Sequence, residues 1–120
     1  MNLKEIADEL VAGCREDRAK ENLDKLYASD AVSVEAVDYS GMGQEVQGRD
    51  AIRGKHEWWE GAHEVSSATV SDPYLHGDDR FAVIFEVQGK VKESGESFDM
   101  REVGVYHVAD GKIVREEFFY

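Results

Sequence analysis

The last third of the chain decides the fold: residues 80–120 are RFAVIFEVQGKVKESGESFDMREVGVYHVADGKIVREEFFY. Apolar and polar side chains alternate along this stretch with the period of two that β-strands show. The turn residues Ser94-Gly95 and Asp110-Gly111 interrupt the alternation. The pattern therefore predicts an antiparallel meander with strands at about 80–92, 97–108 and 112–120, preceded by another strand at about 64–75.

The two turns allow a prediction of the strand register. A two-residue turn at 94–95 places Phe85 opposite Gly104. A turn at 110–111 with a glycine bulge places Gly104 opposite Glu116. The residues that then share one sheet face are Phe81, Val83, Phe85, Val87, Phe98, Met100, Glu102, Gly104, Tyr106, Val114, Glu116, Phe118 and Tyr120.

Two carboxyl groups interrupt this apolar face. In the predicted register Glu102 and Glu116 are diagonal neighbours beside Gly104, where the missing side chain leaves room for a ligand or a water molecule. Carboxyl groups in such a place are hydrated, paired, or raised in pKa by burial and mutual repulsion. The pattern has two interpretations: a chemical site, or glutamates at a sheet end that reach water.

The opposite sheet face is half apolar, and no predicted helix covers it. A two-fold dimer packed sheet to sheet explains such a face. The residues expected in that interface are Ile84, Val103, Val105 and Ile113.

The first half of the chain is mainly helical. An apolar stripe that starts at Leu3 predicts a first helix, capped by Asn2 with Glu5 as its partner. A second helix buries Leu23, Leu26 and Tyr27, and a third, over 50–60, has Ile52, His56 and Trp59 on one face. Between them, alternation from Ala31 predicts a strand, and glycines predict a loop over 38–48. This order of elements predicts an α+β domain.

Composition limits the class of protein. The 120 residues are 42% hydrophobic and 33% charged, which suits one globular domain over residues 1–120. A net charge of −12 argues against a nucleic-acid or anionic-membrane surface. The single cysteine rules out an internal disulfide and fits a reducing compartment. With no apolar run of membrane-spanning length and no signal core, we expect a cytoplasmic protein.

Four blocks of the sequence resemble the nuclear-transport-factor-2-like superfamily, also called SnoaL-like. They are LYASDAVSVE at 26–35, GRDAI at 48–52, FEVQG at 85–89 and DGKIV at 110–114, and together they span most of the chain. The resemblance implies a cone, in which a strongly curved sheet wraps around helices and encloses one pocket. The superfamily includes ketosteroid isomerases, polyketide cyclases, scytalone dehydratases and limonene epoxide hydrolases, so the fold indicates no single activity.

The resemblance also implies site residues. The general base of the ketosteroid isomerases lies at the end of the first strand, where this chain has Glu35. A pocket-lining tyrosine of their third helix corresponds to His56. Periodicity alone places Glu35 on the polar side of its strand, so only the resemblance brings it into the pocket. The apolar pocket walls correspond to Phe81, Val83 and Phe85.

Other family features are missing. The two oxyanion donors of the ketosteroid isomerases correspond to Gly104 and Val11, neither of which can donate from its side chain. Steroid isomerisation is therefore not implied. The Asp-Arg-Asp unit of the epoxide hydrolases also has no match, because Asp99 and Arg101 fall on the outer sheet face.

Three functions fit these observations. The first is an acid–base enzyme for a small apolar carbonyl or polyketide-like substrate, with Glu35 as base and His56, Glu102 or Glu116 as proton donor or oxyanion partner. The second is a non-catalytic module that binds an apolar or aromatic ligand, and the third is a dimeric interaction module. The expected ligand contacts are Tyr27, Trp59, Phe81, Val83, Phe85, Met100, Gly104, Tyr106, Phe118 and Tyr120. We expect no metal and no cofactor, because the four histidines lack ligand spacing.

Overall fold

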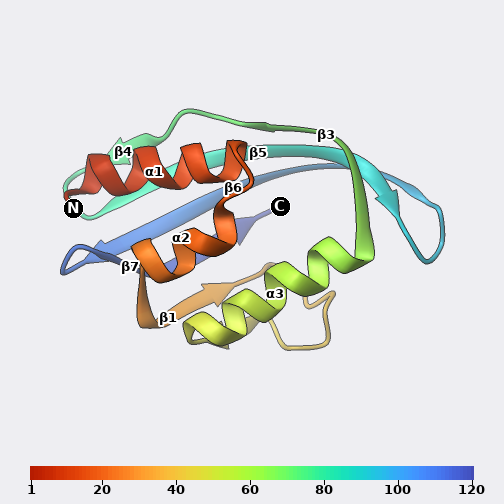
Figure 1. Ribbon diagram of the computed structural model, residues 1–120, viewed down its shortest axis with the longest axis horizontal. Coiled ribbons are helices and arrows are strands. Elements are labelled where there is room, and N and C mark those ends of the chain that lie inside the picture. Colours follow the sequence, from red (N-terminus) through yellow and green to blue (C-terminus); the bar gives the residue numbers. More distant parts are fainter.

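Three helices lie against the concave side of one curved, unclosed sheet in the computed structural model, which describes residues 1–120 (Figure 1). The strand order is β2-β1-β7-β6-β5-β3, with β4 paired to β5. The predicted α+β cone is confirmed. The elements are α1 (Leu3–Arg15), α2 (Ala19–Leu26), β1 (Tyr27–Val34), β2 (Glu45–Gln47), α3 (Arg49–Ala62), β3 (His63–Val70), β4 (Tyr74–His76), β5 (Arg80–Val91), β6 (Ser97–Ala109) and β7 (Lys112–Phe119).

Helix α1 begins with the predicted capping box. The side chain of Asn2 accepts a hydrogen bond from the Glu5 amide at 2.9 Å, and the Glu5 carboxylate accepts one from the Asn2 amide at 2.9 Å. Two amides that would otherwise lack partners at the helix start are thereby satisfied. The apolar stripe of the helix packs its buried residues, among them Ile6 and Leu10, into the core.

Replacing Asn2 with alanine should lower the free energy of unfolding by about 1 kcal/mol, because the Glu5 amide loses its acceptor. Urea denaturation of the Asn2→Ala variant measures the change, and the denaturant dependence should be the same in both proteins. Asn2→Asp, which keeps the acceptor, is the matched control and should stay close to the parent. An equal loss in both variants would show that the missing acceptor is not the cause of the change.

The β5–β6 hairpin is shifted by two residues from the predicted register. The Val91 amide donates to the Glu96 carbonyl at 2.9 Å, so four residues, 92–95, form the turn, and Gly95 in it has a positive φ of 73°. Phe85 therefore lies opposite Glu102, and Val83 opposite Gly104. A shift of two keeps every side chain on its predicted face, because the side-chain period of a strand is two. The prediction of which residues share a sheet face is therefore correct for β5 and β6, but the predicted residue pairs across these strands are wrong.

The β6–β7 hairpin combines the tight turn with a bulge. Asp110 and Gly111 have φ values of 52° and 74°, which suit a two-residue turn that pairs Ala109 with Lys112. The register then shifts between His107 and Val108, so that Gly104 lies opposite Phe118 rather than Glu116. The bulge turns Ile113 inward, and it is fully buried in the core. Its predicted place on the outer sheet face was wrong.

Strand β1 makes the sheet mixed rather than purely antiparallel. It pairs with β7 in parallel, with Ser33 opposite Glu116, and with β2 in antiparallel fashion. The strand begins at Tyr27, which we had predicted at the end of the second helix. Ala31 and Ser33 are fully buried, so the odd-numbered side chains in the last part of β1 face the cone interior. This direction brings Glu35, just beyond the strand, to the same side.

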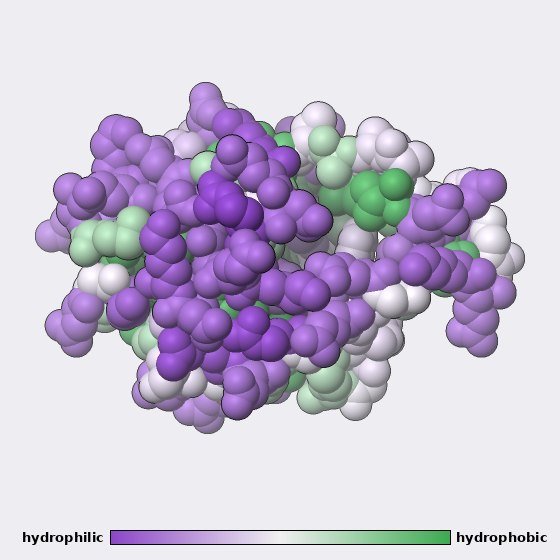
Figure 2. Space-filling view, in the orientation of Figure 1, coloured by the Kyte–Doolittle hydropathy of each residue, from purple (hydrophilic) through white to green (hydrophobic).

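The core lies between the helices and the concave sheet face, and its buried residues come from α1, α2, α3 and five strands. The view in Figure 2 shows a mainly hydrophilic surface with separate apolar patches, in keeping with the net charge of −12. The hairpin of β5 and β6 extends beyond the helices (Figure 1). None of the three helices is long and apolar enough to cross a membrane.

Candidate active site in the cone interior

Glu116 is a buried carboxyl group on the inner face of β7. It is 2% exposed, and the hydroxyl of Tyr27 donates a hydrogen bond to its Oε2 at 3.1 Å. Burial raises the pKa of Glu116 to about 7, because the charged form loses its hydration, and the charge of Lys55 opposes the rise. Burial also raises the pKa of Tyr27, so its hydroxyl stays protonated and remains the donor.

Glu102 reaches the same interior from β6. Burial again raises its pKa to about 7, and the charges of Glu35 and Glu116 add to the rise. The corrected register places the Gly104–Phe118 pair between the two carboxyl-bearing positions, so Glu102 and Glu116 are not the diagonal neighbours that we predicted. They still influence each other through the low-dielectric interior. Both can hold a proton near neutral pH.

Glu35 lies at the edge of this interior in an ion pair with Lys55. The distance from Lys55 Nζ to Glu35 Oε1 is 2.8 Å, and the side chains are 12% and 25% exposed. Tyr120 donates a hydrogen bond to Glu35 Oε2 at 3.2 Å. Lys55 also donates to Ser33 Oγ at 2.7 Å. The charge of Glu35 raises the pKa of both Glu102 and Glu116, so the strand end that the resemblance indicated lies close enough to act on both.

Sequence reasoning missed Lys55. The predicted site did not include it, although Lys55 is three residues after the buried Ile52 and next to His56. This spacing puts Lys55 on the helix face that packs on β1. A lysine on an otherwise apolar helix face was the signal that could have revealed it.

Aromatic rings fill much of the interior. Phe81 and Tyr106 stack with ring centroids 4.9 Å apart, and Phe118 meets Tyr106 edge to face at 6.2 Å. A side chain at Gly104 would come within 3.0–3.2 Å of Tyr106, Phe85 and Phe118. The room that we expected at Gly104 is therefore occupied by these rings, and the glycine allows their close approach.

The other predicted contacts lie at different depths. Val83 is fully buried in the core, whereas Tyr120 is 46% exposed at the edge. Trp59 stacks on His63 with centroids 4.5 Å apart and meets Phe98 edge to face, near the start of β6. Met100 is half-buried on β6. The contact of Trp59 with Phe98 joins α3 to the long hairpin.

His56 faces a different electrostatic environment from the glutamates. Burial lowers its pKa, so the ring is neutral near neutral pH. The charges that act on it are those of Glu60, Lys55, Lys20 and Arg53, and none of the three interior glutamates is among them. The structure gives His56 no hydrogen bond or ion pair with the three interior glutamates.

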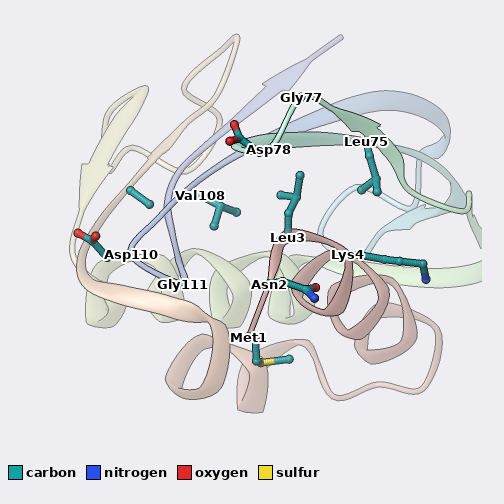
Figure 3. Close-up of a pocket in the computed structure, with 11 residues that line it drawn as sticks. Met1, Asn2, Leu3, Lys4, Leu75, Gly77, Asp78, Val108, Asp110 and Gly111 are labelled. Carbon is teal, nitrogen blue, oxygen red and sulfur yellow. The ribbon is translucent and has the colours of Figure 1, made fainter.

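Two surface hollows lie away from this cluster. One, of about 490 Å³, lies between the N-terminus and the turns before β5 and β7, and Figure 3 shows Leu3 between Leu75 and Val108 there. The other, of about 280 Å³, lies along β3, β5 and β6 and includes Phe98. None of the three interior glutamates lines either hollow. The site is thus an interior that aromatic rings largely fill, with the Glu35 side chain 25% exposed at its edge.

The fold and the site define a cone-shaped α+β domain with an aromatic, carboxyl-rich interior. Residues 1–120 match the model of the SnoaL-like domain family, and the chain belongs to this family. A search of curated proteins gave no match.

Several solved structures share the fold. A SnoaL-like polyketide cyclase candidate from Mesorhizobium loti is 36% identical over 100% of both chains, with a TM-score of 0.91. An isomerase candidate from Bacillus subtilis is 24% identical over 98% of this chain and 88% of its own, with a TM-score of 0.76. A Mycobacterium tuberculosis protein in complex with estradiol-17β-hemisuccinate is 18% identical over 100% of this chain and 95% of its own, with a TM-score of 0.73.

Proposed function

We propose that this protein is an acid–base enzyme for a small, apolar carbonyl or polyketide-like compound, of isomerase, cyclase, dehydratase or hydrolase type. The observation that carries the proposal is a set of three carboxyl groups in and at the edge of an aromatic interior, whose charges act on one another and two of which have a pKa raised to about 7. Proton transfer near neutral pH is most effective with groups whose pKa lies near the working pH. An apolar interior provides such values.

The three carboxyl groups have different roles in this proposal. Glu35 is the base, because its ion pair with Lys55 and its 25% exposure leave a charged carboxylate within reach of a ligand. Glu102 donates or returns a proton, because its raised pKa keeps a large protonated fraction at neutral pH. Glu116 is too deeply buried to touch a ligand. Together with its hydrogen-bond donor Tyr27, it contributes to the electrostatic field at the other two carboxyl groups. We assign no step to His56.

A panel of enones, epoxides and polyketide-like ketones tests the proposal. We expect the protein to convert at least one compound faster than buffer does, with the rate falling as Glu102 loses its proton above about pH 7. NMR spectra of each mixture report both conversion and binding. If the compounds of the panel bind but none is converted, the proposed enzymatic function is wrong, and the alternative, a ligand-binding module, is favoured. The steroid bound to the Mycobacterium tuberculosis neighbour supports that alternative for this fold.

We also propose that two copies of the chain pair through the outer sheet face. No helix covers this face, and its apolar residues Ile84, Val103 and Val105 are only half-buried in one chain. Phe119 pairs with Val103, shares this face and is 55% exposed. Ion pairs border the patch, among them Arg115 with Glu117 at 3.0 Å and Arg101 with Glu86 at 3.4 Å. An apolar centre with charges of both signs at its edge suits a self-complementary interface.

The Val103→Lys variant should be monomeric, because a charge would enter the centre of the apolar patch. Light scattering coupled to gel filtration should give twice the mass of one chain for the parent and the mass of one chain for the variant. The control is Val65→Lys on β3, where the valine is already 45% exposed, and it should stay dimeric. A parent protein that runs as a monomer at high concentration would contradict the dimer.

A further inference from the structure

Lys55 is a cation placed inside a group of carboxyl groups. Its side chain is 12% exposed, and it comes from α3 to meet Glu35 and Ser33 of the β1 end at 2.8 and 2.7 Å. A largely buried ammonium group needs such partners, because the loss of hydration is expensive. Among the charges that act on the pKa of Glu102 and of Glu116, Lys55 supplies the one that lowers both. The interior therefore holds one cation and three carboxyl groups.

The Lys55 ammonium has one bonding direction to spare. It carries three N–H bonds, and Ser33 and Glu35 supply two acceptors. The ammonium nitrogen lies 5.6 Å from the ring centroid of Phe118, which faces the interior. The ammonium group thus lies beside an aromatic ring in a largely water-free interior, where a hydrogen bond from a charged donor is strong.

We propose that Lys55 is a catalytic residue that binds the oxygen of an uncharged carbonyl substrate as negative charge develops on it. This inference rests on the proposed function and names the substrate class for the same site. Glu35 removes a proton from the carbon next to the carbonyl group, and the electron pair of the broken C–H bond moves into the enolate. The proton goes to the Glu35 carboxylate, which becomes neutral, and is returned to carbon when the enolate collapses.

The total charge around Lys55 stays constant through this transfer. Before it, the ammonium is paired with the Glu35 carboxylate at 2.8 Å. After it, the negative charge lies on the substrate oxygen, and the same ammonium can stabilise it without moving far. A fixed cation that is already desolvated needs little reorganisation for this role. Lys55 thereby stabilises the Glu35 carboxylate before the proton transfer and the enolate oxygen after it.

The carboxyl groups explain why the substrate is uncharged. An anionic compound would add a negative charge beside Glu35, and beside Glu102 and Glu116 in their ionised fractions. Like charges in an interior of low dielectric repel strongly. A neutral ketone or enone avoids this repulsion in the ground state and gains the attraction of Lys55 only as the enolate forms, which favours the transition state.

Binding of phenols tests Lys55 without any turnover. The probe is 4-nitrophenol, whose phenolate mimics an enolate oxygen and absorbs at a longer wavelength than the neutral form. We expect the Glu35→Gln protein, whose neutral amide stands in for the protonated base, to bind the phenolate. Adding Lys55→Met to that protein should weaken the binding at least about tenfold, because a charged hydrogen bond is lost. The reference ligand is 4-nitroanisole, which cannot ionise and should bind both proteins equally. Lys90→Met removes an exposed lysine and is the matched control.

The outcomes separate this inference from the proposed function. In the Glu35→Gln protein, equal phenolate affinity with and without Lys55→Met, or no phenolate binding at all, would overturn the role of Lys55 whatever the substrate panel shows. An equal loss of affinity for 4-nitrophenol and for 4-nitroanisole would also overturn it, because the lysine would then only support the fold. Should Lys55→Met fail to fold, Lys55→Gln keeps a donor to Ser33 and removes the charge, with the same expected loss.

Discussion

Replacing Glu116 with glutamine should stabilise the protein at pH 8 by about 3 kcal/mol more than it does at pH 4. The carboxyl group is 2% exposed, and burial raises its pKa from an ordinary 4.5 to about 7. One pKa unit corresponds to about 1.4 kcal/mol, so the difference amounts to about 3 kcal/mol. Glutamine keeps an oxygen that accepts the hydrogen bond of Tyr27, and it cannot ionise.

The sign follows from proton binding. Between pH 4.5 and 7 the folded protein keeps the Glu116 proton while the unfolded chain releases it. Stability therefore falls as pH rises through this window, is unaffected by Glu116 well below 4.5, and has lost the full amount above 7. The burial of Glu116 thus destabilises the fold at neutral pH. Its retention in such a place is consistent with a role in setting the electrostatic field of the site.

Urea denaturation at several pH values measures the effect as the difference between variant and parent. The matched control is Glu64→Gln on β3, where the glutamate is exposed, and its difference should not change with pH. A carboxyl-carbon NMR titration of the same proteins identifies the Glu116 signal and its midpoint. A Glu116→Gln difference that is flat from pH 4 to pH 8 would show that the carboxyl group is hydrated in the folded protein.

The alternation of apolar residues predicted which side chains share the inner sheet face, and for β5 and β6 this assignment holds. The residue pairs across the two strands were predicted wrongly, because the turn at 92–95 has four residues instead of two. A shift of two residues leaves the hydrophobic pattern unchanged, so the pattern cannot detect it. Only the geometry of the turn fixes that register.

The β6–β7 hairpin shows a related limit. The Asp110-Gly111 pair strongly indicates a two-residue turn. With such a turn alone, however, the apolar side chains of β6 and β7 would point to opposite faces of the sheet. The chain resolves the conflict with a bulge near Val114, which turns Ile113 into the core. A bulge has no clear sequence signal here, since Ile113 and Val114 are both β-branched and apolar. The face of Ile113 was therefore not predictable from the alternation.

The candidate site was partly visible in the sequence. Glu102 and Glu116 stood out because they interrupt an apolar face, and Glu35 was reached only through the family resemblance. Lys55 was missed because a lysine in an acidic protein is usually a surface residue. Its contact with Ser33 depends on how α3 crosses β1, and that packing joins residues 22 positions apart in the chain. Local periodicity carries no information of this kind.

Replacing Glu35 with glutamine should lower the turnover of the best panel ketone by about 10²- to 10⁴-fold, because the proton acceptor is lost. Deuterium exchange into the carbon next to the carbonyl group, followed by proton NMR in D2O, measures the proton transfer directly. Glutamine has the size of glutamate and offers an oxygen to Lys55 and Tyr120, which contact Glu35 at 2.8 and 3.2 Å. Ligand affinity should therefore change little while exchange is lost.

The matched control is Glu45→Gln, which removes a carboxylate from β2 that is 64% exposed and pairs with Arg115 on the surface. It should exchange at the parent's rate. If Glu35→Gln exchanged as fast as the parent, Glu35 could not be the base, and Glu102 would be the carboxyl group to test next. If exchange and ligand affinity fell together, Glu35 would have a structural role at the edge of the cone. Loss of exchange with intact binding is the one result that assigns the proton transfer to Glu35, since a structural role would move both.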